Sequence, residues 1–136
     1  MLEVSRREFE AGWSRARHAY ETGRNPLNNA HRLLLFYAVE NGLKAIITSA
    51  ERAAVEFSEE KHNLNKLMDR ARVAAVFRLP RSVRVRSSRG HVQRNCGIGD
   101  LNQVWRYGCI AEQPTDNELE ASLKKLAEWI ERSLEE

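Results

Sequence analysis

The chain has 136 residues, of which 42% are hydrophobic and 30% are charged, and its formal net charge is +3. This balance is ordinary for a globular protein and predicts a single domain spanning residues 1–136. The N-terminal residues lack the apolar core of a signal peptide, and the longest strongly apolar run, residues 33–39, is too short to span a membrane. We therefore expect a cytoplasmic protein that does not contact membranes.

Metal and cofactor motifs are missing from the sequence. Cys96 and Cys109 are the only cysteines, twelve residues separate them, and no Cys/His knuckle lies nearby, so a structural zinc site is not expected. The chain also has no Walker motif, no GxSxG and no HExxH. We expect reduced thiols, no bound metal and no cofactor.

The first predicted helix carries its apolar residues on one stripe. Phe9, Trp13, Ala16 and Tyr20 follow one another at intervals of four, three and four residues, which places them on the same helical face. Gly23 is expected to end this helix.

The second predicted helix, residues 31–53, is the most apolar segment and should occupy the centre of the fold. Gly42 costs roughly 1 kcal/mol relative to alanine in a helix, so it should allow a neighbouring element to approach closely. Glu40 and Lys44 have the i,i+4 spacing of an ion pair. Seven residues form the expected core face: Leu35, Phe36, Val39, Leu43, Ile46, Ile47 and Ala50.

Two further long helices complete the predicted bundle. Residues 62–77 form the third, with Leu64, Leu67, Met68, Ala71 and Ala75 on its apolar face. Residues 115–136 form the last, opened by a capping box of Thr115 and Glu118. A short helix beginning at Asp100 lies between them and should bury one of Trp105 and Tyr107.

Residues 78–100 lose helical periodicity. The alternating stretch 82–86 would suit a short strand, but Pro80 and three glycines (Gly90, Gly97 and Gly99) favour a loop. The predicted fold class is therefore all-α, a bundle of four or five helices with one long basic loop.

The basic loop is the main candidate binding site. Residues 78–94 contain six arginines, one histidine and no acid, whereas residues 112–136 have a net charge of −5. Such a loop can bind phosphates, dock on an acidic surface of its own or another chain, or remain a solvated loop. The candidate nucleic-acid-binding residues are Arg78, Arg81, Arg84, Arg86, Arg89 and Arg94.

Three segments taken in order resemble the HEPN superfamily of small helical bundles: residues 37–47, 62–67 and 105–108. This resemblance implies a four- to five-helix bundle that works as a homodimer or inside a larger complex. Many members are metal-independent endoribonucleases with an Arg/His pair facing its copy across the dimer interface, and others are binding or assembly modules. Members occur in toxin–antitoxin, CRISPR and phage-defence systems, some beside a separate partner protein.

The family's catalytic spacing, an arginine and a histidine separated by four to six residues, occurs three times. Arg86 and Arg84 both precede His91 at such spacings, and Arg24 precedes His31. Roughly 1.5 matches are expected by chance in so arginine-rich a chain, so spacing alone identifies nothing. The last helix has no histidine, which departs from the nuclease pattern. We therefore favour a non-catalytic module that contacts RNA or an acidic partner, with a nuclease using Arg86 and His91 as the alternative.

Overall fold

The computed structural model describes residues 4–23, 28–51, 56–87 and 93–136. These ranges contain five α-helices and a three-stranded antiparallel sheet. The helices are α1 (Arg6–Thr22), α2 (Asn29–Glu51), α3 (Leu64–Arg70), α4 (Leu101–Arg106) and α5 (Asp116–Glu135). The strands are β1 (Ser82–Arg86), β2 (Gln93–Gly97) and β3 (Ile110–Gln113), and two short 3-10 helices are η1 (Ala75–Phe77) and η2 (Ile98–Asp100).

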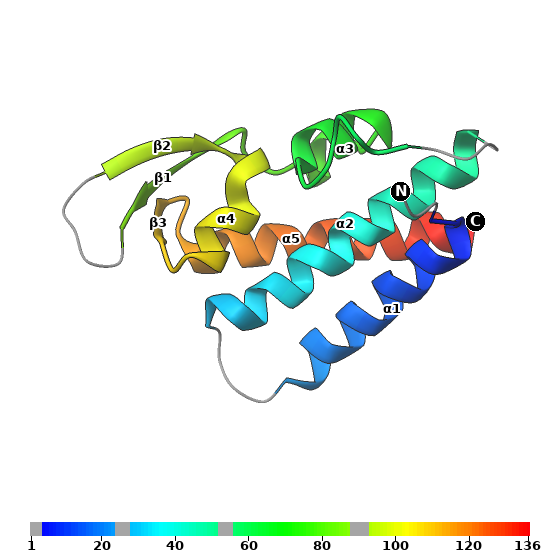
Figure 1. Cartoon of the computed structure of the whole chain (residues 1–136), viewed down its shortest axis with the longest axis horizontal. Coiled ribbons are helices and arrows are strands. Elements are labelled where there is room, and N and C mark those ends of the chain that lie inside the picture. Colours follow the sequence, from blue (N-terminus) through cyan, green and yellow to red (C-terminus); the bar gives the residue numbers. More distant parts are fainter. Residues whose placement is uncertain (1–3, 24–27, 52–55, 88–92) are drawn as a thin grey trace.

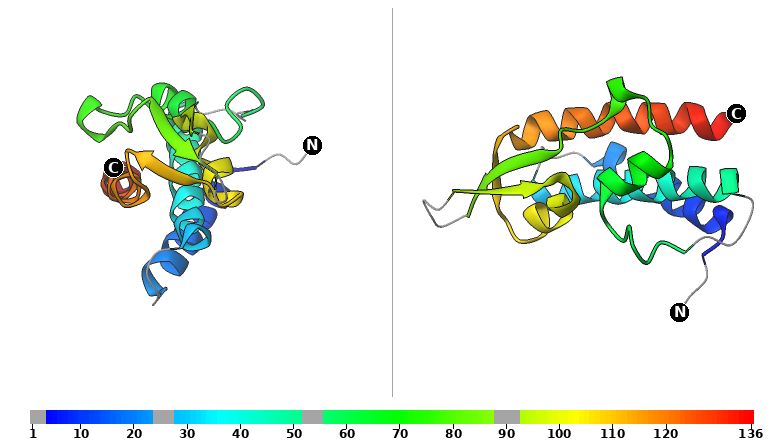
Figure 2. Two further views of the ribbon diagram at one scale, coloured as in Figure 1. Left: turned by 90° about the vertical axis from the view of Figure 1, so that its left-hand side faces the viewer. Right: turned by 90° about the horizontal axis from the view of Figure 1, so that it is seen from above.

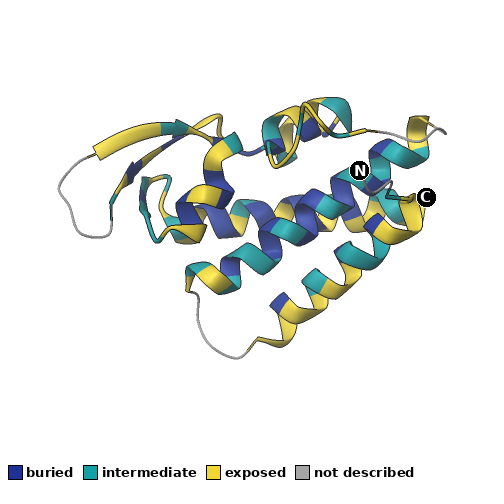
Figure 3. Cartoon of the chain, viewed as in Figure 1, coloured by how far each residue is buried: buried dark blue, intermediate teal, exposed yellow. Residues whose placement is uncertain are grey.

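The apolar helix α2 lies at the centre of the bundle, as its composition predicted. It packs against α1, α3, α4 and α5, and the two views in Figure 2 show α1 and α5 on different sides of it. Leu35, Phe36, Val39 and Leu43 are almost fully buried, and Figure 3 shows buried stretches alternating with intermediate ones along the middle of α2. By length and composition α2 would also fit a membrane span, yet half of its most apolar window is buried in the bundle, as in the core helix of a globular protein.

Gly42 is the point where the three long helices meet. A Cβ atom at this position would lie 2.6 Å from Cγ2 of Ile130 on α5 and 2.9 Å from Cε3 of Trp13 on α1. Both distances are shorter than van der Waals contact, so only glycine lets these side chains pack against the backbone of α2. The predicted close approach at Gly42 is confirmed.

The ends of α1 and α5 follow local sequence signals. Thr115 and Glu118 form the predicted capping box at the start of α5, and Ser5 and Glu8 form a second one at the start of α1. Helix α1 ends at Thr22, and the N–H of the C-cap residue Gly23 donates to the Tyr20 carbonyl. Each box satisfies backbone N–H groups that have no partner inside the helix.

The third helix is much shorter than predicted. Helix α3 stops at Arg70, and Arg72 adopts the left-handed conformation with φ 56°. This reversal turns Val73 into the core, while Ala75, which was expected on the apolar face, is exposed in η1. The β-branched residues of this stretch are weaker helix formers than the residues before them, and burial of Val73 outside the helix prevails over the remaining periodicity.

The prediction of one long loop over residues 78–100 was wrong, because most of its described part forms a β-hairpin. Strands β1 and β2 pair in an antiparallel register that runs from Ser82↔Gly97 to Arg86↔Gln93. Strand β3 pairs with the other edge of β1, so the strand order is β2-β1-β3. Among the residues that argued for a loop, Pro80 precedes β1, Gly97 is the last residue of β2 and Gly99 lies in η2, whereas Gly90 lies outside the described residues.

The sheet lies at one end of the bundle, where β1 and β2 extend beyond the adjacent ends of α2 and α5 (Figure 1). Its inner face covers the core with Val83, Val85 and Ala111, all of which are buried. Its other face carries Arg84 and Arg86, which are exposed. The strand periodicity of two thus turns part of the basic segment into an ordered surface.

Candidate nucleic-acid interface

The outer face of the β1–β2 hairpin presents arginine and amide side chains side by side. Arg84 lies opposite Asn95, and Arg86 lies opposite Gln93, in the antiparallel register. All four side chains are exposed. Directly opposed residues on one face have Cβ atoms about 4.5–5.5 Å apart. The hairpin therefore offers two adjacent guanidinium–amide pairs, a set rich in hydrogen-bond donors for phosphate oxygens and bases.

One of these arginines already has a carboxylate partner. Arg86 Nε lies 3.2 Å from Glu112 Oε1 on β3, and Gln93 Nε2 donates to Glu112 Oε2 at 3.2 Å. In contrast, Arg84 and Arg81 are exposed and form no ion pair with any residue that the structure describes. Arg84 is therefore the arginine of β1 whose charge is most available to an anionic ligand, while a ligand would compete with Glu112 for Arg86.

The other predicted contact residues are dispersed. Arg78 pairs with Asp69 and donates from Nε to the Val73 carbonyl at 2.9 Å, so it stabilises the turn after α3. Arg89 and His91 lie outside the described residues, so the predicted catalytic pairs with Arg84 and Arg86 remain predictions. Arg24 of the third pair lies outside them too.

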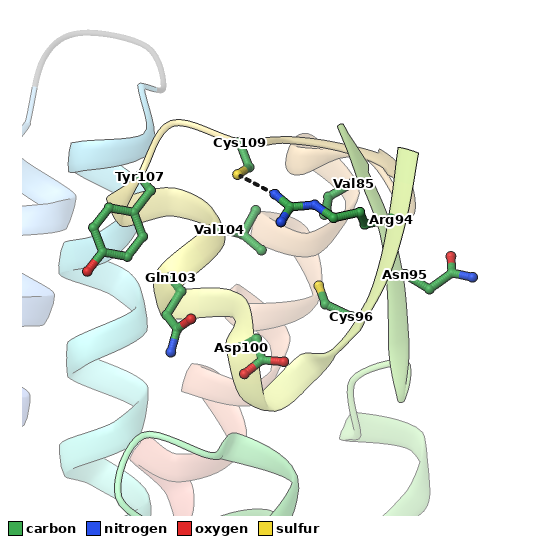
Figure 4. Close-up of a pocket in the computed structure, with 9 residues that line it drawn as sticks. All are labelled: Val85, Arg94, Asn95, Cys96, Asp100, Gln103, Val104, Tyr107 and Cys109. Atoms are coloured by element: carbon green, nitrogen blue, oxygen red, sulfur yellow. Dashed lines mark hydrogen bonds between the residues drawn. The ribbon is translucent and has the colours of Figure 1, made fainter. Parts of the chain in front are cut away.

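Arg94 points to the opposite side of the sheet from Arg84 and Arg86. It lies opposite the buried Val85, and its side chain crosses a pocket between β2 and α4, with Nη2 3.9 Å from Cys109 Sγ (Figure 4). A thiol is a weak acceptor, and no carboxylate pairs with Arg94 among the residues the structure describes. The pocket has a volume of about 340 Å³. It is lined by Val85, Arg94, Asn95, Cys96, Asp100, Gln103, Val104, Tyr107 and Cys109.

Tyr107 was not among the residues that the sequence singled out as a contact site. It follows α4 and lies at the side of the pocket away from β2 (Figure 4), with 67% of its surface exposed. The Arg106 guanidinium lies 5.6 Å from the centre of its ring. Trp105 beside it is buried, which confirms the prediction that one of the two aromatic residues would be core and the other surface.

Cys96 lacks the environment of a reactive thiol. Both cysteines line the pocket and both are half-buried. Burial raises the pKa of the Cys96 thiol above its ordinary value, with Asp100 and Cys109 acting in the same direction and Arg94 opposing them. Cys96 therefore remains protonated near neutral pH, and a protonated thiol is a poor nucleophile and a poor metal ligand.

The acidic last helix does not hold the basic hairpin in the described part of the chain. Its carboxylates pair instead with the first two helices: Glu131 with Arg17 at 3.0 Å, and Glu120 with Arg32 at 2.8 Å. This finding disfavours the interpretation in which the basic segment docks on its own acidic helix.

A second polar cluster forms around Glu40 on α2. Lys44 Nζ lies 3.0 Å from Glu40 Oε2, as the i,i+4 spacing predicted, and His62 Nδ1 lies 2.7 Å from Glu40 Oε1. Glu40 is buried, so these partners compensate the cost of burying its charge. Glu40, Lys44 and His62 do not line the pocket between β2 and α4. Their cluster holds α2 to the segment before α3.

Within the described ranges, no three His, Cys, Asp or Glu side chains gather as a metal site would require.

Comparisons with known proteins add no family to these observations. No family model matches the chain, and no curated protein or solved structure is significantly similar to it. The resemblance to the HEPN superfamily therefore remains a prediction from short sequence segments.

Proposed function

We propose that this protein is an RNA-associated binding or assembly module that contacts the phosphate backbone through the outer face of its β1–β2 hairpin. The observation that supports this proposal most is the pairing of Arg84 with Asn95 and of Arg86 with Gln93 on one exposed face. Guanidinium groups bind phosphate oxygens with two parallel hydrogen bonds, and amides supplement them. A two-stranded ribbon is also a known shape for contacting nucleic acid.

The position of the hairpin favours the same function. Its strands extend beyond the ends of the long helices, so a polymer can approach the arginines without contacting the bundle (Figure 1). Arg81 lies just before β1 and is exposed as well. A solvated loop would need no such order, whereas pairing in a sheet holds the guanidinium groups at a fixed spacing.

The biological setting of the proposal follows from the HEPN resemblance alone. That resemblance favours a cytoplasmic protein of a defence or toxin–antitoxin system, acting as a homodimer or with a separate partner protein. Light scattering of the purified protein tests whether it is a homodimer, for which the expected mass is twice the 15.7 kDa of one chain.

Salt-dependent RNA binding tests the proposal. Binding of a labelled single-stranded RNA is measured by fluorescence anisotropy over a range of salt concentrations. Each phosphate contact contributes about 0.7 to the slope of log affinity against log salt for single strands, so removing two arginines in Arg84→Ala/Arg86→Ala should lower the slope by about 1.4. The matched control is Arg7→Ala/Arg15→Ala, which removes the same charge from exposed positions on α1.

Two results would contradict the proposal. Equal losses of affinity in the hairpin variant and in the α1 control would show that only net charge matters. Absence of RNA binding, together with hairpin-dependent binding of an acidic protein, would favour the protein-partner alternative. Gel analysis of the same samples in EDTA should show intact RNA, and cleavage lost in His91→Ala would instead support the nuclease.

A further inference from the structure

We infer that the pocket between β2 and α4 holds one unstacked nucleobase of a single-stranded RNA, with Tyr107 as its stacking surface and Arg94 beside it. This inference deepens the proposed function and rests on it. It assigns the protein a preference for single strands over duplexes, because a base inside a duplex cannot enter such a pocket.

The size and lining of the pocket suit an aromatic ligand. Its volume of about 340 Å³ lies at the lower end of the range of about 300–1,000 Å³ that small-ligand sites occupy. Val85 and Val104 contribute apolar surface, and polar groups come from Arg94, Asp100 and Gln103. Apolar walls with a few polar groups are the usual composition of a small-molecule site.

Tyr107 is the feature that points to a base rather than to a free phosphate. Among the described residues, Tyr107 and Val76 are the large hydrophobic side chains that remain strongly exposed. Exposing an aromatic ring to water is unfavourable, and a stacked base would cover it. Arg106 above the same ring adds positive charge where the adjoining phosphates would lie.

Arg94 and Asp100 give the pocket its expected selectivity. The guanidinium of Arg94 has only the thiol of Cys109 as a partner among the described residues, so its donors remain available to a base or phosphate. Asp100 stands at the N-cap position of α4 without capping it, and its side chain is exposed and forms no hydrogen bond with the described part of the chain. A carboxylate can only accept, so it favours a base with an exocyclic amino group, such as cytosine, over uracil.

The sheet can place one strand of RNA on both of its sides. Arg94 lies between Gln93 and Asn95 on β2, and because successive side chains of a strand alternate, its side chain emerges on the side opposite to theirs. Strand β2 is also an edge strand of the sheet. A single strand that follows the arginines of the outer face can therefore turn over this edge and insert a base. A rigid duplex cannot make that turn.

Affinity measurements with Tyr107 variants provide the first test. Tyr107→Ala should weaken binding of short oligocytidine about fivefold or more, whereas Tyr107→Phe, which keeps the ring, should retain most of the affinity. Val76→Ala is the matched control, because it truncates the other strongly exposed apolar side chain and should change nothing. Oligocytidine should bind more tightly than oligouridine, and Asp100→Asn should reduce that difference.

Protection of Cys109 from alkylation provides the second test and reports the pocket directly. Oligocytidine, and cytidine monophosphate at higher concentration, should slow alkylation of Cys109 by a maleimide, as measured by peptide mass spectrometry. Failure of both ligands to protect Cys109, with unchanged affinity in Tyr107→Ala, would overturn the inference. Protection by increasing protein concentration alone would also overturn it, because a second copy of the chain would then cover the pocket.

The two proposals fail in different ways. If the pocket is wrong and the hairpin is right, Arg84→Ala/Arg86→Ala still reduces RNA affinity while Cys109 stays unprotected. If the hairpin is wrong and the pocket is right, cytidine monophosphate protects Cys109 although Arg84→Ala/Arg86→Ala binds RNA like the native chain.

Discussion

Arg32 Nε donates a hydrogen bond to Glu120 Oε1 at 2.8 Å, and this ion pair links α2 to α5 within the core. The two side chains are 9% and 5% exposed, respectively. Tyr20 of α1 donates to the second carboxylate oxygen, and the remaining nitrogens of the guanidinium donate to Asn29 and Asn117. The pair therefore joins three helices, and every partner is needed because an unpaired buried charge is costly.

Glu120→Ala should strongly destabilise the fold. It leaves the Arg32 guanidinium buried without its carboxylate, and breaking a buried pair in this way costs about 3–5 kcal/mol of unfolding free energy. Urea denaturation measures the change. Glu131→Ala is the control, because Glu131 pairs with Arg17 at the surface and should cost less than about 1 kcal/mol. Equal losses in the two variants would contradict the structural role of the buried pair.

Tyr20 should make stability depend on alkaline pH. Burial and, next, the hydrogen bond to Glu120 raise the pKa of the Tyr20 hydroxyl well above its ordinary value of 10. Below pH 10 the phenol is protonated in both states, so its stabilisation is complete. Above pH 10 the unfolded chain loses this proton while the folded chain keeps it, so stability falls as pH rises.

Tyr20→Phe tests this dependence. The unfolding free energy of both proteins is measured by urea denaturation between pH 8 and pH 11. Tyr20→Phe should be less stable at pH 8, because Glu120 loses a hydrogen-bond donor. Its stability should decline less steeply above pH 10, and an equally steep decline in both proteins would show that other groups cause it.

Gly42→Ala should destabilise the packing of the three long helices. The new methyl group would overlap Ile130 and Trp13, and overpacking of this kind costs about 1–3 kcal/mol, offset by about 1 kcal/mol from the better helix propensity of alanine. Gly12→Ala on α1 is the matched control, because its methyl group would meet the end of the Asn41 side chain at 3.0 Å, which can rotate away. Thermal unfolding of the two variants should separate them clearly.

Glu112→Gln should strengthen RNA binding through the hairpin. The carboxylate of Glu112 holds Arg86, and removal of its charge leaves the guanidinium free for a phosphate. Since exposed ion pairs contribute about 0.2–1 kcal/mol, the affinity should rise about 1.4- to fivefold at low salt. The gain should disappear in an Arg86→Ala background, and a gain that persists there would reflect only the change in net charge.

The sequence by itself determined the helical framework. Periodic apolar residues identified α1, α2 and α5, the Thr115–Glu118 capping box marked the start of α5, and the spacing of Glu40 and Lys44 identified their ion pair. These features depend on neighbours within about four residues, so a local pattern is sufficient to reveal them.

Only the tertiary structure decided how the basic segment is arranged. Strand β2 has no apolar alternation of its own, and β1 acquires its two faces by pairing with β2 and with the distant β3. That pairing places Arg84 and Arg94 on opposite sides of the sheet and brings Tyr107 to the same pocket as Arg94. Likewise, Arg32 and Glu120 are 88 residues apart and meet in the core. Such contacts leave no periodic signal, because they form between segments that are brought together only when the chain folds.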